Sequence, residues 1–586
     1  MTDELSETVP SQVAEYWQLV LRAQTLLMRA TEVASKKTMG GEFSIVDTNS
    51  VVAAYSKIAL EMMSRPDALL ALQKASFQKL ADFWTTGFIG NDDTVPDRRF
   101  KDKAWGEDPF SRAFRDAHLA LEKATMEIMN RFPKGSKEQL RAEFYTRQLL
   151  SALAPSNFFA LNPAARKKFL ETKGQSLLDG FSNFLDDLER GDGRLDIATN
   201  DTGAFVVGRD LGTTPGKVIF QNDMMQLIQF EPRTKTQYKK PILFVPAWIN
   251  KYYIMDMREK NSLVRYMLDR GHTVFIISWV NPGPEHAEKS FESYMNEGPL
   301  AALDVIEQVT GEHKINILGF CIGGILVTAT LAYLAAKGDN RIASATTLAT
   351  MVDFTDVGEI GVFIDEDRLV ALREHMAKKG HLEDHHMRDM FSMIRENDLI
   401  WSFHVMNYLM GNKPPAFDLL YWNSDSTRMP AAMLLWYLEE IYLRNALRQP
   451  GGLSLNGTAI DIGKIKAPFF VLATKDDHIA PWHSIYPTTR LLGGDVKFVL
   501  GGSGHIAGVI NPPGEREKYG YWLNSEYPDT PDDWLEEAEF SKGSWWPEWA
   551  KWLERKDRAA KVTAREPGSE EYPVIEDAPG SYVLKK

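Results

Sequence analysis

From about residue 205 the chain alternates short apolar runs with segments of helical periodicity. The apolar runs are rich in β-branched and aromatic residues and lie at 242–248, 273–279, 314–320, 343–350, 468–474 and 496–502. Helical patterns separate most of them, for example at 258–270 and 322–336. Apolar runs bounded by helices are typical of parallel strands buried on both faces. We therefore predict a mainly parallel sheet, entered through an antiparallel pair of strands around Asn222–Asp223.

The first 200 residues carry a helical pattern instead. Apolar residues recur about every 3.6 residues, as on one face of an amphipathic helix, in 11–34, 50–63, 66–84, 110–130 and 137–153. The segment 190–205 is rich in Gly, Asp and Asn, which is typical of a linker or a domain boundary. We expect a mainly helical N-terminal domain over 1–200 and a second, catalytic domain over 205–586.

A long insertion separates the fourth and fifth of the main apolar runs, over about 351–466. A crossover between parallel strands needs only about a dozen residues. The insertion is rich in Met, aromatic and charged residues, and its pattern is helical. A long insertion at the carboxyl edge of a parallel sheet is the usual place for a cap or lid, so we expect one here.

The composition of the chain excludes some classes of function. The chain has 586 residues and a formal net charge of −13, which argues against a nucleic-acid-coating protein. Its single cysteine excludes an intrachain disulfide and suits a reducing cytoplasm. The acidic N-terminus does not resemble a signal peptide, and no apolar run is long enough to predict a membrane span.

That single cysteine lies in a pattern with chemical meaning. Gly319-Phe320-Cys321-Ile322-Gly323 joins a predicted strand to a predicted helix as G-x-C-x-G, a nucleophile elbow with Cys in place of Ser. Its glycines keep Cβ atoms out of the tight turn, and the helix N-terminus favours a thiolate. A lone cysteine is otherwise most often buried and inert. This sequence context favours a nucleophile and predicts an α/β-hydrolase fold with a helical cap insertion.

An oxyanion formed at this cysteine needs two hydrogen-bond donors. The backbone N–H of Ile322 is the first candidate. The second is expected in the loop after the first main apolar run, within Ala247–Asn250, where Ile249 is our candidate.

A thiolate nucleophile also needs a base and a group that orients the base. In this fold the acid and then the histidine follow the nucleophile along the chain. Asp476, Asp477 and His478 directly follow the run at 468–474, and His505 lies in a Gly/Ser-rich loop after the last run. We predict Asp477 as the acid, with Asp476 as the alternative, and His505 as the base. Either aspartate could instead cap a helix, and His478 could be a structural neighbour.

Two other clusters favour structural interpretations. His381 and His385 stand four residues apart in HLEDHH, a spacing that can bind zinc, but a third ligand beyond Asp384 is not evident. A solvated helix face is the favoured interpretation, and no metal is expected. The Trp-rich segment 543–553 could anchor a partner or a membrane surface, but core packing of a C-terminal helix is favoured.

Long motifs give the chain a family resemblance. GFCIGG, DDHIAPW, GGSGHIAGVINPP, VPAWINKYYIMD and SLVRYMLDRGHTVFIISWVNPG all resemble class I polyhydroxyalkanoate synthases. The resemblance continues upstream in DRRFKDKAWGEDP and downstream in GSWWPEWAKWL, and is weakest in the first 85 residues. Trp422 matches a family position in the insertion.

The resemblance implies roles and partners. It makes Cys321 the acyl-carrying nucleophile, Asp477 the acid and His505 the base. It implies (R)-3-hydroxyacyl-CoA substrates, poly(3-hydroxybutyrate)-like products, a homodimer, and residence on cytoplasmic storage granules. CoA is then a leaving group, and no cofactor is expected.

The sequence leaves two rival functions open. A cysteine-dependent thioesterase or polyester depolymerase would carry the same elbow, and a non-catalytic granule-coating protein could share the scaffold. A cysteine nucleophile suits synthesis, because thioester exchange keeps the acyl group activated until a hydroxyl attacks it. The insertion would then have to keep water from the acyl-enzyme.

Overall fold

The computed structural model describes residues 13–16, 18–26, 28–29, 31, 51, 55–56, 97–129, 136–514, 518–557 and 560–586. The chain divides into two compact units. The first contains residues 1–201 together with 389–416, and the second contains 202–388 and 417–586. The boundary after Asp201 falls within the Gly- and Asp-rich segment 190–205.

The first unit is helical over its described residues. Its main helices are α5 (Pro109–Met129), α6 (Lys137–Ala152), α7 (Pro163–Glu171) and α8 (Gln175–Arg190), with the short α4 at Ala104–Glu107. The helices expected at 110–130 and 137–153 are thereby confirmed. Helical residues also occupy the described parts of 11–34 and 50–63, whereas the helix expected at 66–84 lies outside the described residues.

Part of the expected insertion belongs to this helical unit. The π-helical segments η8 (Asn397–Trp401) and η9 (His404–Leu409) lie within 389–416. The Tyr408 hydroxyl donates to Asp187 of α8 at 2.5 Å, and a Cβ at Gly180 would come within 1.9 Å of the Tyr408 carbonyl oxygen. Gly180 therefore allows the close approach of α8 and η9. The single insertion expected over 351–466 is divided between the two units.

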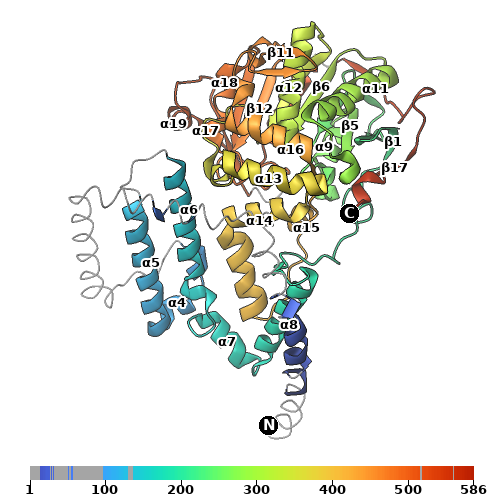
Figure 1. Ribbon diagram of the computed structural model, residues 1–586. Coiled ribbons are helices and arrows are strands. Elements are labelled where there is room, and N and C mark those ends of the chain that lie inside the picture. Colours follow the sequence, from blue (N-terminus) through green and yellow to red (C-terminus); the bar gives the residue numbers. More distant parts are fainter. Residues whose placement is uncertain are drawn as a thin grey trace. The chain divides into compact units, whose positions relative to one another are not determined.

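The second unit is built on an 11-stranded sheet in the order β15-β14-β13-β12-β7-β6-β4-β5-β2-β1-β17 (Figure 1). All pairings from β13 through β5 in this order are parallel, and the flanking pairs are antiparallel. The parallel strands are β4 (Ile242–Val245), β5 (Val274–Trp279), β6 (Ile315–Phe320), β7 (Ile342–Leu348), β12 (Phe469–Thr474) and β13 (Val496–Gly501). They confirm the predicted runs. The antiparallel entry pair is confirmed as β1 (Gly216–Gln221) and β2 (Met225–Phe230).

Further strands extend both edges of the sheet. These are β14 (Gly520–Leu523), β15 (Glu539–Lys542) and β17 (Glu576–Asp577). β13 pairs with β14, and β17 pairs with β1, both antiparallel. The sheet thereby includes a short strand from close to the C-terminus.

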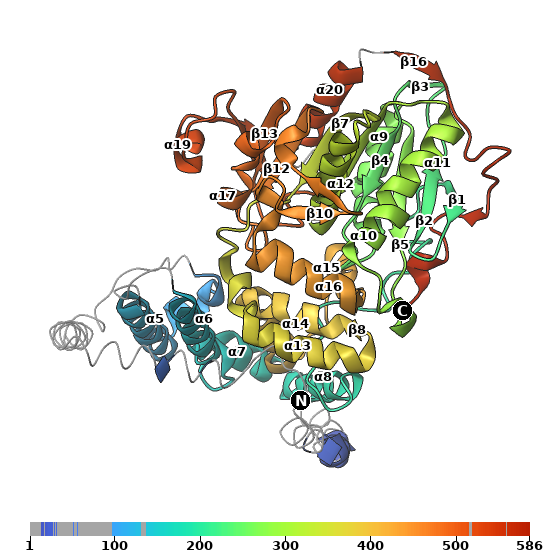
Figure 2. The same cartoon turned by 45° about the horizontal axis from the view of Figure 1, so that its top comes forward.

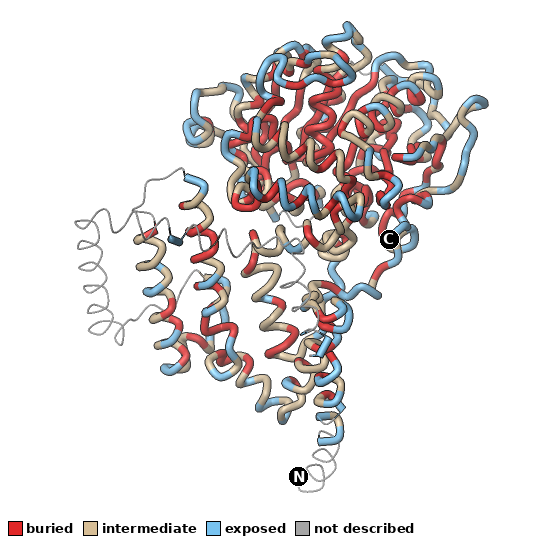
Figure 3. Tube along the Cα trace, viewed as in Figure 1, coloured by how far each residue is buried: buried red, intermediate tan, exposed pale blue. Residues whose placement is uncertain are grey.

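Helices cover the sheet. α9 (Leu263–Asp269) and α20 (Trp546–Asp557) share one apolar core with alternate residues of the central strands. α12 (Ile322–Lys337) packs on β6, and Figure 2 shows α11 (Ala301–Thr310) and α12 along one face of the sheet. Buried positions are concentrated in the strands and in α12 (Figure 3). This burial explains why the strands are apolar along their whole length.

The part of the insertion that stays in the second unit is mostly helical. It contains α13 (Glu366–Lys379), the first residues of α14 (Asp384–Ile394), α15 (Asp418–Ser424), α16 (Ala431–Trp436) and the π-helical η10 (Tyr437–Leu443). The residues of α14 from Asp389 onwards belong to the first unit. Two short strand pairs interrupt the expected helical pattern: β8 (His381–Leu382) with β9 (Met429–Pro430), and β10 (Leu453–Leu455) with β11 (Thr458–Ile460). Among the described helices, none combines the length and apolar character of a membrane span.

Candidate active site

Cys321 lies at a strained turn between β6 and α12. Its backbone has φ 54° and ψ −124°, a conformation that costs a non-glycine residue free energy and occurs most often at functional sites. The turn is held from both sides. The Cys321 N–H donates to the Leu348 carbonyl at 2.9 Å, and the Cys321 carbonyl accepts from the amide of Gly324 at 2.9 Å. The side chain is partly buried at the start of α12.

The glycines around the cysteine leave no room for side chains. A Cβ at Gly319 would lie 2.5 Å from the Cα of Gly324, and one at Gly323 would lie 2.3 Å from the Val245 carbonyl oxygen. A Cβ at Gly324 would lie 2.1 Å from the Thr350 hydroxyl oxygen. The turn therefore depends on the close approach of α12 to β6 and to the end of β4. This close packing explains why the G-x-C-x-G pattern has glycine on both sides of the cysteine.

Asp477 and His505 form a buried pair. His505 Nδ1 lies 2.7 Å from Asp477 Oδ2, and both residues are buried. The carboxylate is fixed in turn, since Asp477 Oδ1 accepts from the amides of Ile479 and Ala480 at 2.9 Å, and Oδ2 accepts from the Thr474 hydroxyl at 3.0 Å. These bonds orient the carboxylate that orients the imidazole.

The electrostatics of this pair favour a protonated imidazole beside an ionised carboxylate. Burial by itself lowers the pKa of His505, but its interactions with Asp477 and Cys321 raise it well above its ordinary value. Burial by itself raises the pKa of Asp477, but His505 and the two backbone amides lower it below its ordinary value. The interaction of His505 with Cys321 that contributes to this shift links the imidazole to the sulfur.

The structure separates the neighbouring candidates from this pair. Asp476 is exposed, and its backbone N–H donates to the Ser503 carbonyl at 3.0 Å. His478 is partly buried in the same loop. Asp477 is the aspartate that the structure places against His505.

The loop that carries His505 is anchored on β6 and α20. The His505 ring stacks on Phe320, with ring centroids 5.4 Å apart. Trp545 and Trp546, at the start of α20, donate their indole N–H groups to the carbonyls of Gly508 and Val509, each at 3.0 Å. Both tryptophans are buried, so core packing of the Trp-rich segment is confirmed.

The loop after β4 is held by the insertion. Trp422 donates its indole N–H to the Lys251 carbonyl at 2.6 Å, and Thr427 donates its backbone N–H to the Ile249 carbonyl at 3.0 Å and its hydroxyl to the Trp248 carbonyl. These carbonyl bonds fix the course of the loop in which we expect the second oxyanion donor. Its close approach to α12 is set at Gly323. The donors expected at Ile322 and Ile249 stay predictions.

Two tyrosines that interact electrostatically with the cysteine were not predicted from the sequence: Tyr437, which is buried, and Tyr442, which is half-buried. They lie together in η10, with ring centroids 5.4 Å apart. Burial raises the pKa of both, and the negative charge of Cys321 adds to this shift. They are therefore neutral hydroxyl groups within electrostatic reach of the sulfur. The segment YLEEIYL has no motif that would have indicated this place.

The histidines that lie together in the insertion are not the pair that the sequence spacing suggested. Within the described part of the chain, the His, Cys, Asp and Glu side chains whose ligand atoms gather closely enough for a metal ion are His375, Glu383 and His386. His381 instead pairs in β8 with Pro430 of β9. His381, Asp384 and His385 are thus not brought together, and this face is largely half-buried, so the expected solvated helix face is wrong.

Comparisons with known proteins identify the fold and the family of the chain. Residues 96–267 match the family model described as the N-terminus of poly-beta-hydroxybutyrate polymerase (PhaC), and residues 240–512 match that of the alpha/beta hydrolase fold. The expected fold class is thereby confirmed.

Several curated proteins are similar over most of the chain. A poly(3-hydroxyalkanoate) polymerase of Methylorubrum extorquens is 43% identical, with 92% of this chain and 91% of that protein covered. The poly(3-hydroxyalkanoate) polymerase subunit PhaC of Cupriavidus necator is 40% identical, with 84% and 83% covered. The chain therefore belongs to the poly(3-hydroxyalkanoate) polymerase family.

Proposed function

We propose that this protein polymerises (R)-3-hydroxyacyl-CoA, with 3-hydroxybutyryl-CoA and similar short-chain monomers as substrates, into poly(3-hydroxyalkanoate) and releases CoA. Both relatives named above are described as poly(3-hydroxyalkanoate) polymerases. The observation that carries the proposal is the buried Asp477–His505 pair, which interacts electrostatically with Cys321 at its strained turn. In this scheme Cys321 is the nucleophile, His505 the base and Asp477 the orienting acid.

The first step transfers an acyl group to the enzyme. The Cys321 thiolate attacks the thioester carbonyl, and the amides of Ile322 and Ile249 stabilise the resulting oxyanion. The carbon–sulfur bond to CoA then breaks, and the CoA sulfur takes the proton held by His505. The products are S-acyl-Cys321 and free CoA. No cofactor is required, since CoA leaves with its own sulfur.

The second step makes the polyester bond. The hydroxyl of another 3-hydroxyacyl unit gives its proton to His505 and attacks the acyl carbon on Cys321. The carbon–sulfur bond breaks and the sulfur leaves as a thiolate, while an oxygen ester forms. The charge of Asp477 stabilises the imidazolium produced in this step. An oxygen ester is more stable than a thioester, so the step is favourable.

Water has to be kept from the acyl-enzyme, because otherwise the protein would act as a thioesterase. The insertion carries the residues that hold the loop after β4, and it supplies Tyr437 and Tyr442 within electrostatic reach of the sulfur. We assign the shielding to this part of the insertion.

One incubation separates the proposed polymerase from its rivals. The protein is given 3-hydroxybutyryl-CoA, and both CoA release and product size are measured. Turbid, high-mass polyester supports the proposal, whereas free 3-hydroxybutyrate would identify a thioesterase. Absence of CoA release would identify a coat protein. Cys321→Ala should lower CoA release by at least about a thousandfold without lowering the melting temperature by more than a few degrees.

We further propose a homodimer that resides on cytoplasmic polyester granules. The support is the likeness of the chain to the synthase family and the polyester nature of the product. Sedimentation of the purified protein tests the dimer. Fractionation of cells that accumulate polymer tests the location, and recovery of the protein away from the granules would contradict it.

A further inference from the structure

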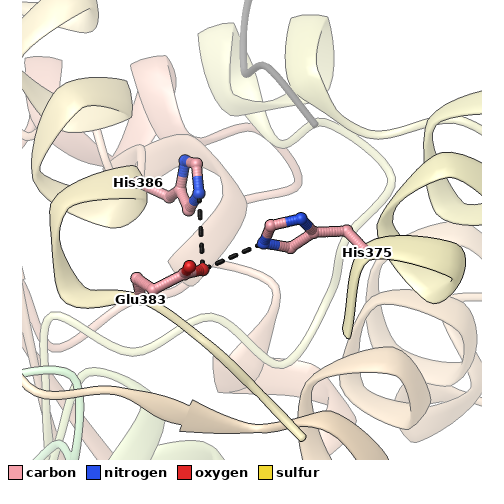
Figure 4. Close-up of side chains that lie close together, drawn as sticks. All are labelled: His375, Glu383 and His386. Carbon is pink, nitrogen blue, oxygen red and sulfur yellow. Dashed lines mark hydrogen bonds and ion pairs between the residues drawn. The ribbon is translucent and has the colours of Figure 1, made fainter. Parts of the chain in front are cut away.

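Three side chains of the insertion converge at a point that the proposed reaction does not use. His375 lies on α13, Glu383 follows β8, and His386 lies on the first turn of α14. The chain reverses after α13 at Gly380, whose φ of +78° suits glycine. Figure 4 shows both imidazoles beside one carboxylate.

The distances in this cluster match those between ligands of one ion. Nε2 of His375 lies 2.9 Å from Oε2 of Glu383, and Nε2 of His386 lies 3.5 Å from the same oxygen. All three ligand atoms lie within 4.8 Å of one another. Tetrahedral zinc with bonds of about 2.0 Å separates its ligand atoms by roughly 3.3 Å. Small side-chain rotations would therefore suffice to bring all three atoms to a common ion.

The orientation and surroundings of the rings suit the same geometry. The planes of His375 and His386 are 89° apart, so the two rings approach the carboxylate from different directions. The side chains of both histidines are only 10% exposed, and that of Glu383 is 18% exposed. The cluster is therefore largely shielded from water, unlike an accidental surface pair.

We propose that His375, Glu383 and His386 bind one Zn²⁺ ion. Two imidazole nitrogens and one carboxylate oxygen form a donor set that zinc favours, and a fourth position remains for water. The ion would link α13 to α14 and so stabilise the insertion. It has no part in the acyl-transfer steps.

A nearby ammonium group weakens the site and offers a test of it. Lys379 contacts Oε1 of Glu383, the carboxylate oxygen that does not face the histidines. Its positive charge opposes a divalent cation at Oε2. Removal of this charge should therefore strengthen zinc binding at this place and at no other.

The test uses the full chain without a histidine tag, in a Cys321→Ala background that removes the thiolate as a competing ligand. After treatment with a chelator, Zn²⁺ is titrated by calorimetry, and Co²⁺ is added separately to record the visible bands of a tetrahedral ion. Variants His375→Gln, His386→Gln and Glu383→Gln keep hydrogen-bonding groups but weaken the ligand set. His313→Gln is the matched control, because His313 forms an exposed pair with Glu307 at 2.9 Å.

We expect one Zn²⁺ per chain, affinity reduced about tenfold or more in each ligand variant, and no change in His313→Gln. Lys379→Met should raise the affinity severalfold. Zn²⁺ should also raise the melting temperature of the parent but not that of the ligand variants. Equal affinity in parent and ligand variants, or no saturable binding in the parent, would overturn the proposal and leave a hydrogen-bonded cluster. Circular dichroism identifies any variant that fails to fold, and the remaining two then decide.

Discussion

The indole nitrogen of Trp545 donates a hydrogen bond of 3.0 Å to the carbonyl oxygen of Gly508. The Gly508 amide in turn donates to the Gly504 carbonyl at 2.8 Å, which closes a turn around His505. The place of the proposed base thus depends on a buried residue at the start of the last long helix of the catalytic unit.

We predict that Trp545→Phe lowers kcat about tenfold while the free energy of unfolding falls by about 1 kcal/mol. The ring stays in the core, but the loop that carries His505 loses its anchor. Trp549→Phe is the control, because it removes a similar bond of 2.9 Å to Thr346 that does not touch this loop. CoA-release kinetics and denaturant unfolding of both variants check the prediction, and equal activity losses would contradict it.

Asp477→Asn should separate the two chemical steps. Because Asp477 helps to raise the pKa of His505, its neutralisation should move that pKa down, which NMR titration of the imidazole would detect. Elongation should fall by about a hundredfold or more, whereas the first acylation falls less. Asp476→Asn, at the exposed neighbour, should leave both steps unchanged. An Asp477 variant equally slow in both steps would indicate a purely orienting role.

Gly319→Ala should disrupt the elbow. The added Cβ would meet the Cα of Gly324 at 2.5 Å, and backbone cannot move aside as the end of a side chain can. We expect a loss of about 2–4 kcal/mol in the free energy of unfolding and loss of CoA release. Gly514→Ala is the control, because a Cβ there meets nothing within 4 Å. An active, stable Gly319→Ala protein would mean that the turn is less tightly packed than the structure shows.

The buried His272 should make stability depend on pH. Burial, with the charges of Arg270 and Lys561, lowers its pKa from 6.5 to about 3. Its ring stacks on Tyr238, and within the described part of the chain neither ring nitrogen has a hydrogen-bond partner. The folded state therefore favours the neutral form.

Because the folded pKa lies below the unfolded one, the stabilisation is complete above pH 6.5 and is lost as the pH falls towards 3. This loss amounts to about 2 kcal/mol at pH 5. His272→Phe should reduce it, as measured by urea unfolding at several pH values, and an unchanged pH dependence would contradict the prediction. His483→Gln, at an exposed site, serves as the control.

The parallel strands could be predicted because burial on both faces makes them apolar throughout. The same reasoning located Cys321, since a strand followed by closely spaced glycines and a helix is a local pattern. The choice between Asp476 and Asp477 as the acid could not be made from a local sequence pattern. It depends on which of two adjacent carboxylates points inward, and adjacent residues of a loop carry no periodicity that would decide this.

The way in which the insertion is divided between the two units could not be predicted from the sequence. Helical periodicity in 389–416 indicates an apolar face but not the core that receives it, so its membership of the first unit could not be predicted. The spacing of His381 and His385 suggested one helix face, but His381 lies in β8 and His385 lies in α14. The turn at Gly380 brings His375 of α13 together with Glu383 and His386 instead.

The backbone leaves the helical unit after Asp201, returns to it at Asp389 and departs again after Ala416. A chain cut before Thr202 would therefore not be an intact catalytic half. It would retain residues 389–416, whose packing partners in the helical unit, among them Asp187 and Gly180, had been removed. Loss of activity in such a truncated chain could then result from misfolding as well as from loss of a function of the N-terminal residues. Co-expression of the two fragments is the sounder test of what the N-terminal residues do.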